Sequence, residues 1–238
     1  MRWILFILLL MVLQLYAFQT LKTLTQNKVW WTLYGLTVTL ILGGFLWQIF
    51  TYDRSGGWTP SIAYTVGWFI ALISGQLILI AILFFEDLSR IAIGVYNFFN
   101  TEQKFHLPER RKFIAQAALA LSAVPFASLL YGMYQGRYNF RVLRYTLEYD
   151  SLPESFDGFQ ITQISDFHCG SFDNFEKVAY GMDLINEQKS DLLLFTGDMV
   201  NNKSSEARPW VEKLSQLEAP YGKFSILGNH DYGDYTGW

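Results

Sequence analysis

The first part of the chain contains four long apolar runs that carry no Asp, Glu, Lys or Arg. They cover residues 3–18, 29–50, 61–85 and 113–134. A helix needs about 20 apolar residues to cross a hydrocarbon core about 30 Å thick, and the last three runs are long enough. The first run is short enough for a signal sequence, but no clear small-x-small cleavage site follows it. We therefore predict four spans, with residues 88–100 either lying in the membrane interface or extending the third span.

The rest of the chain alternates between short strand-like and helix-like patterns. Strand-like segments cover residues 141–150, 159–165, 191–198 and 223–231, and helix-like segments cover residues 175–188 and 206–217. Strands that alternate with helices of about 10–15 residues are typical of an α/β architecture with a parallel sheet. We predict an α-helical membrane region over residues 1–136 and an α/β domain over residues 137–238.

Composition supports this division and argues against several classes of function. Only 16% of the 238 residues are charged, whereas soluble domains carry about 25%. The net charge is −3, and no basic cluster is interleaved with aromatic residues, so nucleic-acid binding is not indicated. The single cysteine, Cys169, excludes an internal disulfide. Because the spans are uncharged, a transporter is disfavoured. Their glutamines are expected to form interhelical hydrogen bonds: Gln14, Gln48, Gln76 and Gln116.

Basic residues next to the fourth run predict its orientation. Arg110, Arg111 and Lys112 directly precede this run, which favours a cytoplasmic position for them and an outside position for everything after residue 134. The same stretch resembles a twin-arginine export signal, with paired arginines before an Ala-rich, mildly apolar segment. The alternative is an ordinary basic membrane flank. We expect a multi-pass protein of a bacterial cytoplasmic membrane.

Polar residues end three of the strand-like segments. They are Asp166 and His168, then Asp198, then Asn229, His230 and Asp231. Ligands of α/β sheets bind beyond the carboxyl ends of strands, so these side chains would converge at one edge if the strands are parallel. In an extended backbone, residues i and i+2 point to the same side, so Asp166 and His168 can bind one ion together.

The residue types at these strand ends suit a metal site. Carboxylate, imidazole and amide donors fit Mn, Fe, Zn or Mg. Asp198 has two oxygens and could bridge a pair of ions. Two ions about 3.5–4 Å apart can clamp the attacking and leaving oxygens of a displacement at phosphorus.

The blocks D-x-H, G-D-x-x-N and G-N-H-D resemble those of the calcineurin-like metallophosphoesterase superfamily over roughly residues 156–231. The closest resemblance is to its membrane-anchored bacterial branch, which includes phosphohydrolases acting on lipid or nucleotide-lipid substrates. The resemblance implies an α/β/β/α sandwich, truncated in this chain. It also implies two divalent metal ions, and hydrolysis by a bridging hydroxide of phosphomonoesters or phosphodiesters, with lipid-linked ones among the candidates.

The resemblance also implies roles for individual residues. Asp166 and His168 would bind the first ion, Asp198 would bridge, and Asn229 would bind the second ion. His230 would stabilise or protonate the leaving oxygen, with Asp231 orienting it. Other polar or aromatic residues are left open. Cys169 is expected to fill space in a turn, Asn201 either touches the site or caps a turn, and Tyr235 and Trp238 either line a groove or pack.

The family pattern continues with an isolated His and a G-H-x-H block, which do not follow G-N-H-D in these 238 residues. We therefore expect the first part of a longer polypeptide, a fragment inactive by itself, with an inactive natural truncate as the alternative. Two other functions compete with the enzyme: a non-catalytic membrane scaffold with a vestigial metal site, and a transport module with a regulatory domain. The intact set of site residues disfavours the scaffold.

Overall fold

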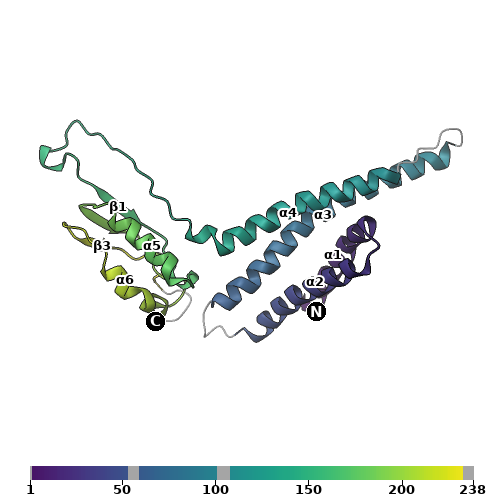
Figure 1. The fold of residues 1–238 in the computed structure, drawn as a ribbon, viewed down its shortest axis with the longest axis horizontal. Coiled ribbons are helices and arrows are strands. Elements are labelled where there is room, and N and C mark those ends of the chain that lie inside the picture. The colour runs from purple at the N-terminus through teal and green to yellow at the C-terminus, as the bar shows by residue number, and fades with distance from the viewer. Residues whose placement is uncertain (1, 53–58, 101–107, 233–238) are drawn as a thin grey trace. The chain divides into compact units, whose positions relative to one another are not determined.

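A computed structural model describes residues 2–52, 59–100 and 108–232 (Figure 1). The chain divides into two compact units. The helical unit comprises Met1–Thr51 and Tyr64–Tyr134, and the sheet unit comprises Tyr52–Ala63 and Gln135–Trp238. Tyr235 and Trp238 lie outside the described residues.

The helical unit is built from four long helices. They are α1 (Arg2–Leu24), α2 (Lys28–Thr51), α3 (Pro60–Phe99) and α4 (Pro108–Tyr134). Each contains a segment long and apolar enough to cross a membrane, which confirms the four predicted spans. α3 is a continuous helix of 40 residues, so residues 88–99 continue the helix of the third span without a break.

Small and polar residues bring these helices together. An added Cβ at Gly75 of α3 would lie 2.9 Å from the carbonyl oxygen of Ser122 in α4, so only glycine permits this approach. Gln14 of α1 and Gln76 of α3 exchange two side-chain hydrogen bonds of 2.7 Å, and Tyr34 of α2 bonds to both at 3.2 Å. The interhelical bonding expected of Gln14 and Gln76 is therefore confirmed.

The sheet unit contains a three-stranded parallel sheet in the order β1-β2-β3. The strands are β1 (Ile161–Ile164), β2 (Leu192–Phe195) and β3 (Lys223–Ser225). Ile161 is in register with Leu192, and Leu193 with Lys223. The predicted parallel arrangement is confirmed, so the three strands end at the same edge.

Helix α5 (Phe175–Asn186) connects β1 to β2 and covers the sheet. It begins at Asn174, whose side-chain oxygen caps the helix by accepting the backbone N–H of Lys177. Val178 and Met182, one turn apart, are 0% and 3% exposed and pack in one core with residues of β2 and the loops around it. The other members of that core are Tyr138, Phe167, Cys169, Leu193, Phe195, Val200, Trp210 and Leu217.

Three short 3-10 helices precede or follow β1, and a longer one follows β2. The first three are η2 (Gly136–Tyr138), η3 (Glu154–Phe156) and η4 (Cys169–Ser171). The helix predicted over residues 206–217 is instead a 3-10 segment, η5 (Ser204–Trp210), followed by the short α6 (Val211–Ser215). Pro209 inside η5 lacks an N–H for a regular helix, which accounts for the interruption.

The strand predicted over residues 141–150 is wrong for the structure as described. These residues have no strand assignment, although their apolar and polar positions alternate. Leu143, Tyr145 and Leu147 are 72%, 81% and 70% exposed. Alternation predicts which side of a strand would be buried, but a strand also needs a hydrogen-bonded neighbour, which this segment lacks among the described residues.

Candidate metal centre

Backbone pairing continues past the ends of β1 and β2 and brings the first two predicted blocks together. The N–H of Asp166 donates to the carbonyl of Gly197 at 3.0 Å, and the N–H of His168 donates to the carbonyl of Asp198 at 2.9 Å. Because the two strands are parallel, their polar ends leave the sheet side by side.

Three residues of these blocks have a left-handed backbone. The φ angles are 53° at Asp166, 45° at His168 and 58° at Asp198. Such angles are unfavourable for residues with a Cβ and persist where the surroundings impose them, often at functional sites. The extended geometry expected for Asp166 and His168 is therefore wrong, because both residues have a positive φ.

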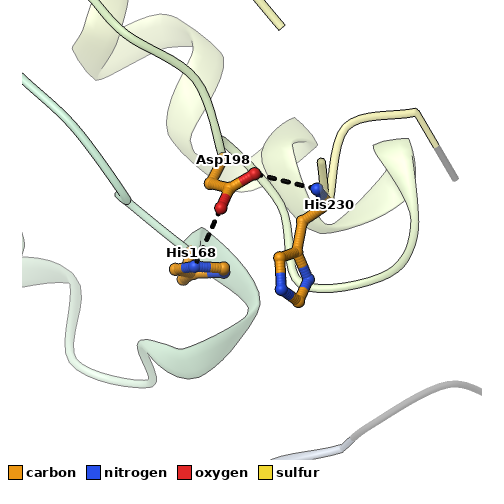
Figure 2. A group of neighbouring side chains, drawn as sticks. All are labelled: His168, Asp198 and His230. Atoms are coloured by element: carbon orange, nitrogen blue, oxygen red, sulfur yellow. Dashed lines mark hydrogen bonds and ion pairs between the residues drawn. The ribbon is translucent and has the colours of Figure 1, made fainter. Parts of the chain in front are cut away.

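The structure gathers His168, Asp198 and His230 into one group (Figure 2). The Asp198 carboxylate faces the imidazole of His168 and the backbone of His230. Its Oδ2 is 3.7 Å from Nε2 of His168, and its Oδ1 accepts the backbone N–H of His230 at 2.8 Å. The two imidazole rings are nearly perpendicular, with centroids 4.6 Å apart. One potential ligand atom from each residue lies within 4.8 Å of the others.

Glycines make this approach of the second and third blocks possible. An added Cβ at Gly197 would lie 2.4 Å from the backbone nitrogen of Gly228, and Gly197 has a φ of 103°. An added Cβ at Gly228 would lie 2.2 Å from Oδ1 of Asp198. Close contact therefore requires glycine at both positions, and at Gly197 the backbone conformation requires it as well.

The Asp231 carboxylate links the loop after β2 to the loop after β3. Its Oδ1 accepts the backbone N–H groups of Met199 at 2.8 Å and Val200 at 3.2 Å, and its Oδ2 accepts that of Gly228 at 3.0 Å. The sequence suggested that Asp231 orients His230. These contacts indicate a role in fixing the loops that carry Asp198 and His230.

The imidazole of His230 is held by a backbone group that the sequence pattern did not single out. Its Nδ1 lies 2.7 Å from the carbonyl oxygen of Asn201. A carbonyl can only accept, so Nδ1 carries the proton, and Nε2 of the neutral ring keeps its lone pair. Asn201 thus contacts a site residue, and its N–H donates to Glu206 at 2.7 Å. Its position at the end of the G-D-x-x-N block was the available signal.

Asp166 and Asn229 do not belong to the group of three. Both are exposed, and Asp166 accepts a hydrogen bond from the hydroxyl of its neighbour Ser165. Both residues nevertheless belong to the loops that follow the strands at this edge of the sheet. The N–H of Asp166 bonds to Gly197, and Asn229 directly precedes His230.

Cys169 is a packing residue, as expected. It is 1% exposed and belongs to the core. Burial, with a smaller effect of the Glu206 carboxylate, raises the pKa of its thiol to about 12, so it does not offer a thiolate at neutral pH.

The donor set fits a divalent metal ion. Two imidazoles and a buried carboxylate combine nitrogen and oxygen ligands that suit Zn, Mn or Fe. Metal bonds to such atoms are about 2.0–2.2 Å long, so one ion can bridge the 3.7 Å between His168 Nε2 and Asp198 Oδ2. The residues present therefore fit such an ion.

Comparisons with known proteins agree with this interpretation. Residues 1–137 match the family described as "Probable Calcineurin-like phosphoesterase, transmembrane domain", and residues 159–238 match "Calcineurin-like phosphoesterase". The chain belongs to this family. Calcineurin-like phosphoesterases use divalent metals, and the sequence-based resemblance is confirmed.

Several curated relatives are membrane proteins or phosphoester hydrolases by name. The metallophosphoesterase YkuE of Bacillus subtilis is 36% identical over 107 residues, covering 44% of this chain and 37% of the relative. A zebrafish (Danio rerio) transmembrane protein with a metallophosphoesterase domain is 25% identical over 215 residues, covering 89% of this chain and 47% of the relative.

A third relative has a named substrate. The UDP-2,3-diacylglucosamine pyrophosphatase LpxG of Chlamydia trachomatis is 33% identical over 123 residues, covering 49% of this chain and 37% of the relative. The chain spans less than half the length of each of these relatives. No solved structure matches it.

Proposed function

We propose that this chain is part of a membrane-anchored, metal-dependent enzyme that hydrolyses phosphomonoesters or phosphodiesters. Residues 1–136 serve as the membrane anchor and residues 137–238 as the N-terminal part of the phosphoesterase domain. The observation that carries the proposal is the clustering of His168, Asp198 and His230 at the carboxyl edge of a parallel sheet.

The proposed roles follow from the chemistry of each side chain. His168 and Asp198 bind metal, with Asp198 shared between two ions, and Asp166 and Asn229 complete the ligand set from the adjoining loops. Bound metal supplies charge neutralisation and activates water for attack on phosphorus. In its doubly protonated form, His230 donates its Nε2–H to the phosphate or delivers that proton to the leaving oxygen, while its Nδ1–H remains bonded to Asn201. Asp231 keeps the two loops in place.

A lipid-linked substrate is the proposed specificity. LpxG is named for a diacylated sugar nucleotide, and this chain is similar to it. In this chain only Gln135 and Gly136 separate the end of α4 from Arg137, which bonds to the loop after His168. The segment that directly follows the last predicted span in sequence is thus bonded to the loop that follows a metal ligand. We place this domain outside the cytoplasm, with Arg110, Arg111 and Lys112 on the inner side.

The direct test is the Asp198→Asn substitution. We expect the unsubstituted chain to bind Mn²⁺ and the substituted chain to lose affinity by more than the roughly 10–100-fold typical of outer-shell changes. Binding is measured by calorimetry on the detergent-solubilised protein. Asp183→Asn, which breaks an exposed 2.8 Å ion pair with Lys213, is the matched control. Equal affinity of Asp198→Asn and the control would refute the proposal.

Hydrolysis is tested separately. The four proposed metal ligands are too few to hold two ions tightly, so we expect little turnover of bis-p-nitrophenyl phosphate by the 238 residues alone. A longer chain that supplies further histidine ligands should hydrolyse it with Mn²⁺, and Asp198→Asn should abolish that activity. Full activity of the substituted longer chain would exclude the bridging role.

A further inference from the structure

The segment that enters the sheet unit is bonded directly to the loop that follows His168. α4 ends at Tyr134, and η2 (Gly136–Tyr138) begins two residues later. Arg137 and Tyr138 of η2 contact Ser171 and Asp173. We call these four residues the entry clamp. All of them belong to the sheet unit.

Arg137 makes two strong contacts in the entry clamp. One guanidinium nitrogen donates to the carbonyl oxygen of Ser171 at 2.7 Å. Another forms an ion pair with Oδ1 of Asp173 at 2.6 Å. The guanidinium also lies 4.9 Å from the centroid of the Tyr138 ring. Because two nitrogens of the planar guanidinium are bonded at once, the contact fixes the orientation of the loop as well as its distance from Arg137. A single ammonium group would fix only the distance.

Tyr138 closes the same loop with a single hydroxyl. The side chain is buried at 9% exposure, and its ring lies 5.6 Å from that of Phe172. The hydroxyl donates to Oδ1 of Asp173 at 2.6 Å and accepts the backbone N–H groups of Asp173 at 3.1 Å and Asn174 at 3.2 Å. Burial, then the hydrogen bond to Asp173, raises the pKa of Tyr138, so the hydroxyl stays protonated at neutral pH.

The loop held in this way restrains the backbone conformation of His168. His168 is the N-cap of η4 and has a φ of 45°. Its carbonyl accepts the N–H of Ser171 at 2.8 Å, and its own N–H is bonded to Asp198. A left-handed conformation is unfavourable for a residue with a Cβ and persists only where the surroundings restrain it. The sheet edge restrains the N-terminal side of His168, and the entry clamp restrains the C-terminal side.

We propose that Arg137 and Tyr138 are positioning residues for the metal centre: by fixing the loop of residues 171–173, they hold the His168 imidazole where it faces Asp198. The inference rests on the proposed function, because it assigns His168 as a metal ligand. It adds that the first turn after the last predicted span sets the metal affinity of the site.

The experiment has two readouts on the detergent-solubilised full chain. Hydrogen–deuterium exchange of the metal-free protein reports whether the loop is held. Tyr138→Phe removes the acceptor of the Asp173 and Asn174 N–H groups, so these amides should exchange faster. Arg137→Ala should raise exchange across residues 168–174. Calorimetric titration with Mn²⁺ then reports positioning, and both variants should bind at least about tenfold more weakly.

Two matched variants separate positioning from general damage. Arg137→Lys can keep the ion pair with Asp173 but not the forked contact with Ser171, so its Mn²⁺ affinity should be intermediate. Asp183→Asn breaks an ion pair between α5 and α6, away from the loop, and should change neither readout.

The outcomes are distinct. Exchange in Arg137→Ala and Tyr138→Phe equal to that of Asp183→Asn would show that the entry clamp does not hold the loop. Faster exchange with unchanged Mn²⁺ affinity would show that the loop does not position His168. Failure of the unsubstituted chain to bind Mn²⁺ would overturn the proposed function and this inference together. Binding that Arg137→Ala leaves unchanged would overturn the inference alone.

Discussion

Left-handed backbone conformations at Asp166, His168 and Asp198 are concentrated where the candidate ligands lie. Of the described residues, only one other non-glycine position, Lys189, has a positive φ. Three kinds of contact offset this strain: backbone bonds between the strand ends, the three N–H groups that donate to Asp231, and the close approaches at Gly197 and Gly228. Several weak restraints therefore hold each ligand-bearing turn, and removing any of them should loosen the site before it unfolds the unit.

A substitution at Gly197 tests the close approach between the loops that carry Asp198 and His230. Gly197→Ala adds a Cβ 2.4 Å from the backbone of Gly228 and also places alanine at a φ of 103°. We expect the free energy of unfolding of the sheet unit to fall by about 2–4 kcal/mol, from strain and steric overlap together. Urea-dependent proteolysis of the solubilised chain measures it.

Gly158→Ala is the matched control for that substitution. Gly158 also has a positive φ, 76°, but nothing lies within 4 Å of an added Cβ. This variant should lose only the conformational part, about 1–2 kcal/mol. An equal loss in both variants would show that the contact between the two loops contributes nothing to stability.

At the scale of elements, some features could be predicted from sequence and others could not. The apolar runs ending in Asp166, Asp198 and Asn229 predicted parallel strands with a shared edge, because burial and strand period are encoded locally. The left-handed turn at His168 was not predictable, since it depends on backbone bonds to Asp198. The role of Asp231 was missed for a similar reason. Two of its three N–H partners, Met199 and Val200, lie about 30 positions away, which no residue pattern records.

The paired glutamines of α1 and α3 give a prediction for the helical unit. Gln14→Leu leaves part of the Gln76 amide without its partner, and should destabilise the bundle by about 0.6–2 kcal/mol. The double variant Gln14→Leu/Gln76→Leu should lose less than twice this amount, because no amide of the pair is then left behind. Denaturation in mixed micelles gives both values.

Gln116 of α4 serves as the control for this pair. It is exposed on its helix, so Gln116→Leu should change stability by less than about 0.5 kcal/mol. Strict additivity of the Gln14 and Gln76 substitutions would indicate that the observed bonds do not couple the two helices.

At the scale of the whole molecule, the length of α3 determines how much of this helix fits inside the hydrocarbon core of a membrane. Its 40 residues rise about 1.5 Å each, which gives a rod about 60 Å long, against a hydrocarbon core of about 30 Å. Even at a tilt of about 40°, the core covers only about 26 residues. Counted from Pro60, that length ends near Glu86, where α3 also carries Asp87 and Arg90. The last turns of α3 therefore lie beyond the hydrocarbon.

Cysteine labelling tests this placement. Phe98 is 79% exposed, and Leu79 is 6% exposed within the bundle. We expect Phe98→Cys to react with a membrane-impermeant maleimide and Leu79→Cys to remain unlabelled. Because Cys169 is buried, the background from the native thiol should be low. Labelling from the cytoplasmic face alone would support the orientation, and labelling from the opposite face alone would reverse it.

The charged residues of α3, which are Glu86, Asp87 and Arg90, lie beside the basic start of α4. Arg110 of α4 donates to the hydroxyl of Ser89 in α3 at 3.2 Å. About 39 Å of helix lies between Pro60 and Glu86, counted at about 1.5 Å per residue, which exceeds the roughly 30 Å of an average hydrocarbon core. A bundle with these two residues at opposite edges of the hydrocarbon crosses it at a slant, so we expect a lipid composition that thickens the bilayer to make the bundle more upright.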